Sequence, residues 1–242
     1  DAVAAQVAKL DEIRQTVVAT SQVPLYVNDP VAVTAEGTPV RIVRNAETNL
    51  GDLCADAYRA LSNADIAFVN GGGIRKQIEA GDITLDDIYS VHPFGNTMCV
   101  IRVTGQQVLD ALEWGARAVP SENGGFLQVS GLTYEIHTGV ASSAEKDENG
   151  MFTRVSGEYR VKNVMVGGQP LELDKTYTLA SHNYMLLGNG DGYTMFDGCE
   201  VLGEDMMVDN QVLITYITTT LGGVVGEQYA NPYGDGRIVA VE

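Results

Sequence analysis

Three consecutive glycines between an apolar segment and an arginine constrain this fold more than any other feature of the sequence. Residues 65–69 (Asp-Ile-Ala-Phe-Val) have the pattern of a short buried strand, and Asn-Gly-Gly-Gly-Ile-Arg follows at 70–75. Glycines at a strand's end permit positive φ and carry no Cβ to keep a ligand away. Arg75 adds a planar fork that suits phosphate or carboxylate. Alone, the run fits a tight turn as well as a loop that binds an anion.

The overall charge excludes whole classes of partner. The chain has 242 residues, 45% of them hydrophobic, which is the composition of an ordinary globular core. Its 32 acidic side chains against 15 basic ones give a net charge of −17, which repels nucleic acid and anionic membranes. A small anionic ligand held by a few local arginines stays compatible with this charge. The sequence also has no apolar run near the ~18 residues that a membrane span needs.

Cysteines and histidines give no sign of a metal or redox centre. The three cysteines lie far apart without a CxxC pair, and we expect Cys54 and Cys99 to pack as small hydrophobic side chains. His92, His137 and His182 form no HxH or similar pair, so we expect them to be packing or loop residues. We therefore predict no metal site and no cofactor in this chain.

The periodicity predicts a single α+β domain with a mixed sheet and flanking helices. A helix is expected over residues 3–18, either docked on its own domain or acting as a linker, and we divide the chain into 1–22 (amino-terminal linker helix) and 23–242 (main domain). Extended segments are expected within 25–43. Surface loops are expected at 142–150 and 222–236. Further helices are predicted from residue 49 and at 84–89, 105–118 and 210–221. Further strands are predicted at 65–69, 98–103, 131–137, 159–166, 177–180 and 237–241.

Four segments place ligand-type side chains in loops beside these elements, where sites usually lie. The first, 44–51 (Arg-Asn-Ala-Glu-Thr-Asn-Leu-Gly), sets Arg44 before a helix start that favours an anion, although a solvated arginine is an alternative. The second is the glycine run. The third, 92–96 (His-Pro-Phe-Gly-Asn), lodges an aromatic between turn formers, and a core phenylalanine is its alternative. The fourth, 183–193, sets Asp191 between two glycines with Tyr184 seven residues earlier.

Taken together, these segments resemble the carboxy-terminal domain of the 5'-nucleotidase family, which includes bacterial UDP-sugar hydrolase and ecto-5'-nucleotidase. The phrases R-x-x-E-T-N-L-G, N-G-G-G-I-R, P-F-G-N and G-D-G-Y occur in the order and approximate spacing of the family. A fifth segment, Gly-Gly-Phe-Leu-Gln-Val-Ser-Gly at 124–131, also matches. The resemblance extends from about Val33 to Ile238.

The resemblance implies how a nucleobase would be held. Phe94 and Tyr184 match the two aromatic walls between which the family stacks the base. Such stacking is worth roughly 1–3 kcal/mol per base and tolerates different bases. Asn96 resembles the residue that hydrogen-bonds the base edge, and Gly124 is expected to supply a backbone contact near the base.

The resemblance also implies how the sugar and phosphate would be held. Asp191 matches the carboxylate that accepts hydrogen bonds from the ribose hydroxyls. Arg44 and Arg75 match arginines that bind phosphate, and Asn70 lies beside them in the family's pattern.

The fourth segment departs from the family pattern in two ways. Tyr184 stands where the best-known members have phenylalanine. The loop to Asp191 is one residue longer than in some members, and Asn189 replaces a usual glycine. An ungapped count back from Asp191 would place Met185 at the aromatic wall, but we favour Tyr184.

The family's hydrolysis uses two metal ions in a separate amino-terminal phosphoesterase domain, which nothing in this sequence resembles. The resemblance therefore implies a substrate-binding domain with no catalytic residue of its own. Its expected partners are a nucleoside monophosphate or related nucleotide and a metallophosphoesterase domain that carries a pair such as Zn or Mn. The expected location is secreted, periplasmic or attached to the cell wall. A stand-alone binding or surface-interaction module stays open as an alternative.

Overall fold

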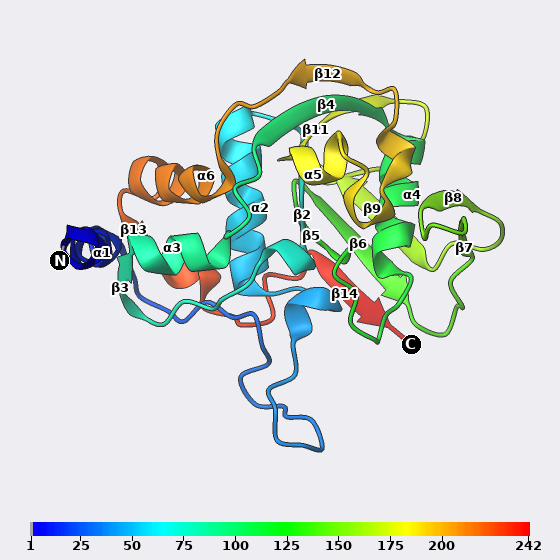
Figure 1. Cartoon of the computed structure of the whole chain (residues 1–242). Coiled ribbons are helices and arrows are strands. Elements are labelled where there is room, and N and C mark those ends of the chain that lie inside the picture. Colours follow the sequence, from blue (N-terminus) through cyan, green and yellow to red (C-terminus); the bar gives the residue numbers. More distant parts are fainter. Residues whose placement is uncertain (1) are drawn as a thin grey trace.

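A five-stranded mixed sheet lies at the centre of the molecule (Figure 1). The computed structural model describes residues 2–242, and for residues 2–5, 7 and 8 it describes the backbone alone. In the central sheet β11 runs parallel to β2, while the other neighbours are antiparallel. Its strands are, in order across the sheet, β12 (Glu200–Gly203), β4 (Met98–Thr104), β11 (Thr176–His182), β2 (Ile66–Asn70) and β5 (Leu127–Ser130).

Three smaller groups of strands surround this sheet. A four-stranded sheet contains β10 (Gln169–Pro170), β9 (Val161–Val166), β6 (Leu132–His137) and β14 (Ile238–Val241). A three-stranded sheet contains β13 (Val224–Val225), β1 (Val17–Ser21) and β3 (Gly81–Thr84). A hairpin contains β7 (Ala144–Lys146) and β8 (Phe152–Val155).

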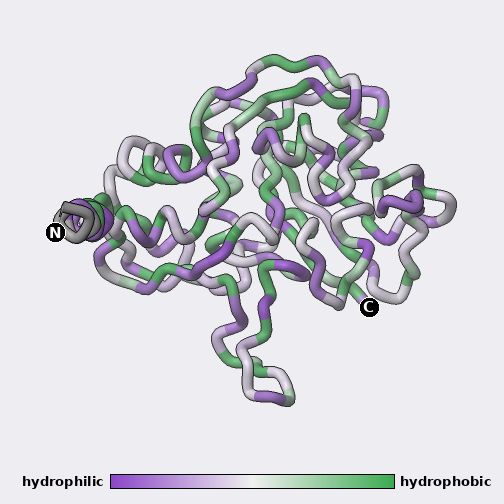
Figure 2. The backbone as a smooth tube through the Cα atoms, in the orientation of Figure 1, coloured by the Kyte–Doolittle hydropathy of each residue, from purple (hydrophilic) through white to green (hydrophobic). Residues whose placement is uncertain are grey.

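The helices cover both faces of the central sheet. The alternation of side chains along each strand divides the core in two: Ala67 and Val69 of β2 face one apolar cluster, and Ile66 and Phe68 face the other. The first cluster includes α2 and α6, and the second includes α4. β4 is apolar along most of its length (Figure 2). The helices are α1 (Ala2–Arg14), α2 (Asn49–Ser62), α3 (Leu85–Val91), α4 (Gly105–Ala116), α5 (Asn183–Leu186) and α6 (Asp209–Thr215).

The predicted α+β class with mixed sheets and flanking helices is confirmed, and so are most of the predicted elements. α2 begins at Asn49 as predicted. Its N-cap is Thr48, whose side chain accepts a hydrogen bond from the backbone N–H of Gly51. The helix predicted at 210–221 is α6 followed by a π-helical turn at Tyr216–Thr220.

The prediction of a helix to residue 18 is wrong in its last four residues. α1 ends at Arg14, and the β-branched segment that follows is strand β1, which pairs with β3 and β13. Leu10 and Ile13 of the predicted apolar face are 59% and 48% exposed. The described part of the chain does not include Asp1, at the start of the predicted linker, or the side chains of Val3 and Val7. Whether residues 1–22 act as a linker stays a prediction.

Two segments that were predicted to be loops contain short β-strands, which the local sequence did not indicate. The segment expected to be a loop at 142–150 holds β7, and the 222–236 segment holds β13. The extended segment 25–43 forms isolated bridges such as Leu25 with Ile78, and its middle projects from the body as a long loop (Figure 1). Cys54 and Cys99 are buried in the core as predicted. Among the described residues, no helix has the length and apolarity that crossing a membrane requires.

Candidate functional site

One cavity of about 520 Å³ is lined by all eight residues that the sequence singled out. They come from segments that are distant in sequence and meet at one end of the central sheet. Two further glycines of the 70–75 run, Gly72 and Gly73, complete the lining. The eight residues are Arg44, Asn70, Arg75, Phe94, Asn96, Gly124, Tyr184 and Asp191.

The glycine run forms the inner wall because no side chain would fit there. After β2 ends at Asn70, residues Gly71–Gly73 form a 3₁₀ turn. The backbone N–H of Gly72 donates to the carbonyl of Gly124 at 2.7 Å. A Cβ on Gly71 would lie 2.1 Å from the carbonyl oxygen of Val43, and one on Gly72 would lie 2.9 Å from that of Gly124. The glycines thus allow three chain segments to meet around the cavity.

Gln128 of β5 holds the loop that carries Arg44. Its side-chain amide donates to the carbonyls of Val43 (3.0 Å) and Ala46 (2.7 Å), and its oxygen accepts from the backbone N–H of Thr48 at 3.2 Å. Gln128 is fully buried, so these bonds form in a dry environment where an unmade bond is costly. The matched segment 124–131 therefore positions the Arg44 loop as well as lining the cavity through Gly124.

Three arginines gather at one side of the cavity. Arg41 donates from Nη2 to the carbonyl of Arg75 at 3.3 Å, and Arg75 donates from Nη1 to the carbonyl of Gly72 at 3.3 Å. Burial lowers the pKa of Arg41, and the positive charges of Arg44 and Arg75 lower it further. Among the described residues none of the three forms an ion pair with a carboxylate. This concentration of positive charge in a chain of net charge −17 suits an anion.

Two aromatic rings line the cavity and remain accessible. Phe94 is 60% exposed and Tyr184 is 44% exposed, which is unusual for rings of this size. The Arg75 guanidinium lies 5.9 Å from the centre of the Phe94 ring. Met185 is fully buried in the core, so the alternative alignment that would place it at the cavity is wrong. Tyr184 lines the cavity.

Asp191 reaches the cavity from a loop with left-handed backbone. Its φ is 54°, and Asn189, which stands where a glycine is usual, has φ 53°. Asparagine and aspartate are the non-glycine residues that tolerate this region best. The Asp191 carboxylate accepts from Asn70 Nδ2 at 2.6 Å and from the Tyr184 hydroxyl at 3.2 Å. Three of the eight predicted residues are therefore joined directly to one another.

Asp209, at the start of α6, holds the loop that carries Asn96. Its carboxylate accepts from the Asn96 backbone N–H at 3.1 Å, and its own N–H donates to the Asn96 carbonyl at 2.8 Å. Burial raises the pKa of Asp209 to about 6, against the lowering effect of the N–H groups of Asn210 and Asn96. Asn96 lines the cavity from this loop.

Two of the three histidines lie directly beneath the glycine run. His92 contacts the carbonyl of Gly73 through Nδ1 at 3.3 Å, and His182 contacts Asn70 Oδ1 through Nε2 at 2.9 Å. Burial lowers the pKa of His92 to about 4 and that of His182 to about 3, the second assisted by His92. His137 pairs instead with Glu135 at 2.9 Å. The histidines act as packing and loop residues here.

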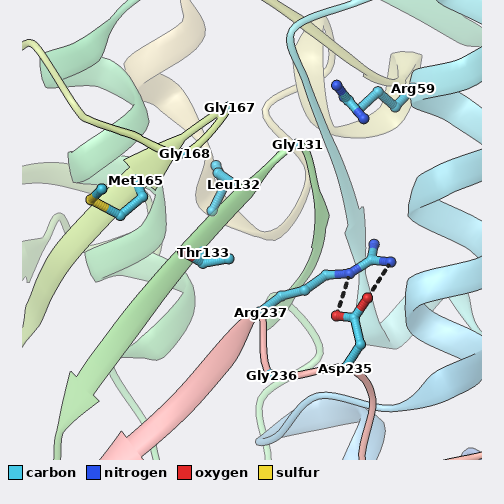
Figure 3. A pocket seen from close by; sticks show the side chains of 10 residues that line it. All are labelled: Arg59, Gly131, Leu132, Thr133, Met165, Gly167, Gly168, Asp235, Gly236 and Arg237. Atoms are coloured by element: carbon cyan, nitrogen blue, oxygen red, sulfur yellow. Dashed lines mark hydrogen bonds and ion pairs between the residues drawn. The ribbon is translucent and has the colours of Figure 1, made fainter.

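A second cavity, of about 430 Å³, lies between Arg59 of α2, the ends of β6 and β9, and the start of β14. Figure 3 shows the Arg237 guanidinium paired with Asp235 at this cavity. The other donors of Arg237 go to Asp56 and to the carbonyl of Val129. Because every N–H of Arg237 has a partner, Arg237 itself offers an incoming anion little.

Three carboxylates beside Arg237 come close enough to hold a metal ion: Glu47, Asp52 and Asp235. However, Glu47 already accepts hydrogen bonds from the backbone N–H groups of Asp235 (2.7 Å), Gly236 (3.0 Å) and Ile238 (2.7 Å). Burial raises the pKa of Asp52, and Arg237 already supplies a cation 3.5 Å from it. The Glu47 carboxylate is therefore engaged in an internal network, and the Arg237 guanidinium already supplies the positive charge beside Asp52, which does not fit a metal centre.

Comparison with known proteins identifies the family of this chain. The chain matches the family described as 5'-nucleotidase, C-terminal domain, over residues 17–198. It is 36% identical over 203 residues to the trifunctional nucleotide phosphoesterase protein YfkN of Bacillus subtilis, covering 82% of this chain and 13% of that protein. It is 34% identical over 176 residues to the 5'-nucleotidase of Vibrio cholerae, covering 73% of this chain and 28% of that protein.

A solved structure extends the match to the whole fold. The 5'-nucleotidase precursor of Thermus thermophilus superposes with a TM-score of 0.78 at 30% identity, over 100% of this chain and 42% of that chain. This protein belongs to the 5'-nucleotidase C-terminal domain family. It spans less than a third of the length of either relative named above.

The sequence did not identify every residue that shapes the cavity. Trp114 donates from Nε1 to the carbonyl of Asp191 at 2.9 Å, and Gln128 and Asp209 hold two of the loops. His182 and Arg41 lie next to predicted segments, and adjacency was the only signal that could have found them. The contacts of Trp114 and Gln128 join residues far apart in sequence, which a single sequence does not reveal.

Proposed function

We propose that this domain recognises nucleotides, with the base between Phe94 and Tyr184 and the phosphate near Arg44 and Arg75. The observation that carries the proposal is a cavity that combines two exposed rings with guanidinium groups and one carboxylate. A nucleotide has a flat heterocycle, a diol and an anion, and each finds a matching group here. Asp191 would accept hydrogen bonds from the ribose hydroxyls, and Asn96 would contact the base edge. Gly124 would supply a backbone contact near the base.

We further propose that hydrolysis takes place in a partner domain of the same parent protein, a metallophosphoesterase domain with a divalent metal pair such as Zn or Mn. When bound there, the metals supply an activated water and stabilise charge on the phosphate. The carboxylate cluster around Asp52 does not fit a metal, and no catalytic residue is assigned to this chain. The role of this domain is to bind the nucleotide and orient it. The family resemblance also supports a secreted, periplasmic or cell-wall location for the parent protein.

Calorimetry on the 242-residue chain tests the recognition step. We expect AMP to bind more tightly than adenosine, which lacks the phosphate, and more tightly than ribose 5-phosphate, which lacks the base. Equal heats for all three ligands, or no binding of AMP, would contradict the proposal. Incubation of this chain with AMP and Zn²⁺ or Mn²⁺ should release no phosphate. Release of phosphate by this chain alone would refute the proposal that hydrolysis takes place in a partner domain.

The second candidate function is a stand-alone binding or surface-interaction module. The cavity residues favour neither candidate over the other, because binding is common to both. The sequence of the parent protein upstream of Asp1 discriminates between the two candidates. An Asp-x-His and Asn-His-Glu set of motifs there supports the hydrolase, and the lack of these motifs supports the stand-alone module.

A further inference from the structure

The carboxylate at the cavity is held by two protein donors from opposite sides. Asn70 Nδ2 donates to Oδ2 of Asp191 at 2.6 Å, and the Tyr184 hydroxyl donates to Oδ1 at 3.2 Å. The backbone N–H of Asp191 donates back to the Tyr184 oxygen at 3.2 Å, so the tyrosine closes a ring with the residue that it orients. Each carboxylate oxygen keeps a free lone pair, because a carboxylate offers about four acceptor positions.

The Asn70 amide is itself fixed from behind by His182. Asn70 Oδ1 lies 2.9 Å from His182 Nε2, and both side chains are buried, with exposures of 4% and 3%. Because the Asn70 NH₂ group faces a carboxylate, which only accepts, its oxygen faces His182, and Nε2 must carry the hydrogen. The low pKa of His182, caused by burial, keeps this imidazole neutral and leaves the pattern intact across the physiological pH range. A chain of hydrogen bonds thus runs from His182 through Asn70 to Asp191.

The backbone of Asp191 needs such support. Its φ of 54° lies in the left-handed region, which is disfavoured for residues that carry a Cβ even though aspartate tolerates it better than most. The Trp114 indole donates to the Asp191 carbonyl at 2.9 Å, and the Tyr184 hydroxyl oxygen accepts a hydrogen bond from the backbone N–H of Asp191. Without the tyrosine hydroxyl and the Asn70 amide, the carboxylate would turn freely about its side-chain torsions.

We propose that the Tyr184 hydroxyl and the His182–Asn70 pair are positioning groups, which fix the Asp191 carboxylate as a two-pronged acceptor for the vicinal diol of a ribonucleotide. The two free acceptor positions, one on each oxygen, match the two adjacent hydroxyls of a ribose. This inference rests on the proposed function and adds to it a stated source of sugar specificity: discrimination against ligands that lack the diol depends on residues 182 and 184 as well as on Asp191.

The test compares AMP with 2',3'-dideoxyadenosine 5'-monophosphate by calorimetry on the 242-residue chain. Tyr184→Phe keeps the ring and removes only the hydroxyl, so we expect AMP to bind about tenfold more weakly and the dideoxy nucleotide to change by less than about twofold. The ratio of the two affinities should fall accordingly. The ring is 44% exposed, so this variant should fold normally.

A histidine series separates positioning from packing. His182→Leu should lower the same affinity ratio, whereas His182→Gln, whose amide N–H can reach Asn70 Oδ1, should restore it to within about threefold of the wild type. If Tyr184→Phe and His182→Leu weaken both nucleotides by the same factor, or change neither, the inference is wrong although the proposed function stands. If the wild-type chain binds neither nucleotide, the proposed function fails as well.

Discussion

Asn70 and Asp191, 121 residues apart in sequence, are joined by a 2.6 Å hydrogen bond at the floor of the cavity. Asn70 is the last residue of β2 in the central sheet, and Asp191 lies in the loop that follows α5. This bond connects the glycine run with the tyrosine-bearing loop. It explains how two segments with different ligand-type side chains come to serve one site.

Replacing Phe94 by alanine should weaken AMP binding by about 1–3 kcal/mol, the usual contribution of one stacked base. Because the Phe94 ring is 60% exposed, the free energy of unfolding should change by less than about 0.5 kcal/mol. Calorimetry and urea unfolding measure the two quantities. Tyr233→Ala is the matched control, since Tyr233 is 46% exposed and does not line the cavity. Equal AMP affinity in both variants would place the base elsewhere.

Arg75→Ala should weaken AMP by about tenfold or more and leave adenosine within about twofold, because hydrogen bonds to a charged group are worth about 1.5–3 kcal/mol. The affinity of the wild-type chain for AMP should also fall as salt rises. Arg154→Ala removes the same charge from the exposed β7–β8 hairpin and serves as the control. Equal losses for AMP and adenosine in Arg75→Ala would rule out its phosphate role.

Asp209→Asn should change the pH dependence of stability. The folded pKa of Asp209, about 6, lies above its ordinary value of 3.8, so the native state binds this proton more tightly than the unfolded chain. The stabilisation is complete below about pH 4 and is lost as pH rises through 6, by up to about 3 kcal/mol. The asparagine variant lacks this dependence. Its stability relative to wild type, measured by urea unfolding, should therefore rise from about pH 4.5 to about pH 7.5.

A constant difference between Asp209→Asn and wild type over that range would show that Asp209 titrates normally. Subtracting the free energy of unfolding of wild type from that of the variant at each pH cancels the contribution of the other carboxylates, which titrate in both proteins. Since Asp209 holds the Asn96 loop, amide exchange at Asn96 reports whether the loop itself loosens.

Glu47→Gln should destabilise the fold by about 2–3 kcal/mol, because the amide cannot accept all three backbone N–H groups that the Glu47 carboxylate binds. Hydrogen exchange should show the first loss of protection at β14, whose first N–H donates to Glu47. Glu172→Gln, at an exposed ion pair with Lys175, is the control and should cost under about 0.5 kcal/mol. Equal stability of the two variants would contradict the anchoring role.

Periodicity and turn chemistry were sufficient to predict the main elements. β4 and α4 follow their predicted ranges closely because β4 is a short apolar run between turns and the apolar residues of α4 recur every three to four positions. The two edge strands of the central sheet, β5 and β12, were not predicted, and neither were the short strands β1, β3 and β13. These strands are defined by pairing with distant segments rather than by local pattern. The left-handed conformation of Asn189 and Asp191 was likewise not apparent from the sequence.

The residues of the candidate site were found through motifs, but the contacts that hold them were not. His182 and Asn70 lie 112 residues apart, and Gln128 and Val43 lie 85 apart, so their hydrogen bonds depend on the completed fold. The sequence marks Tyr184 as a departure from the family's phenylalanine but does not indicate what its hydroxyl binds. The structure places that hydroxyl on Asp191, which a single sequence does not disclose.

The most direct test of the central claim is a ¹H–¹⁵N correlation spectrum of this chain titrated with AMP. We predict that the backbone amide signals of five residues that line the cavity shift first and furthest. These residues are Gly72, Gly73, Asn96, Gly124 and Asp191. Shifts centred on Arg59, Gly131 and Arg237 at the second cavity, or none at saturating AMP, would contradict the account.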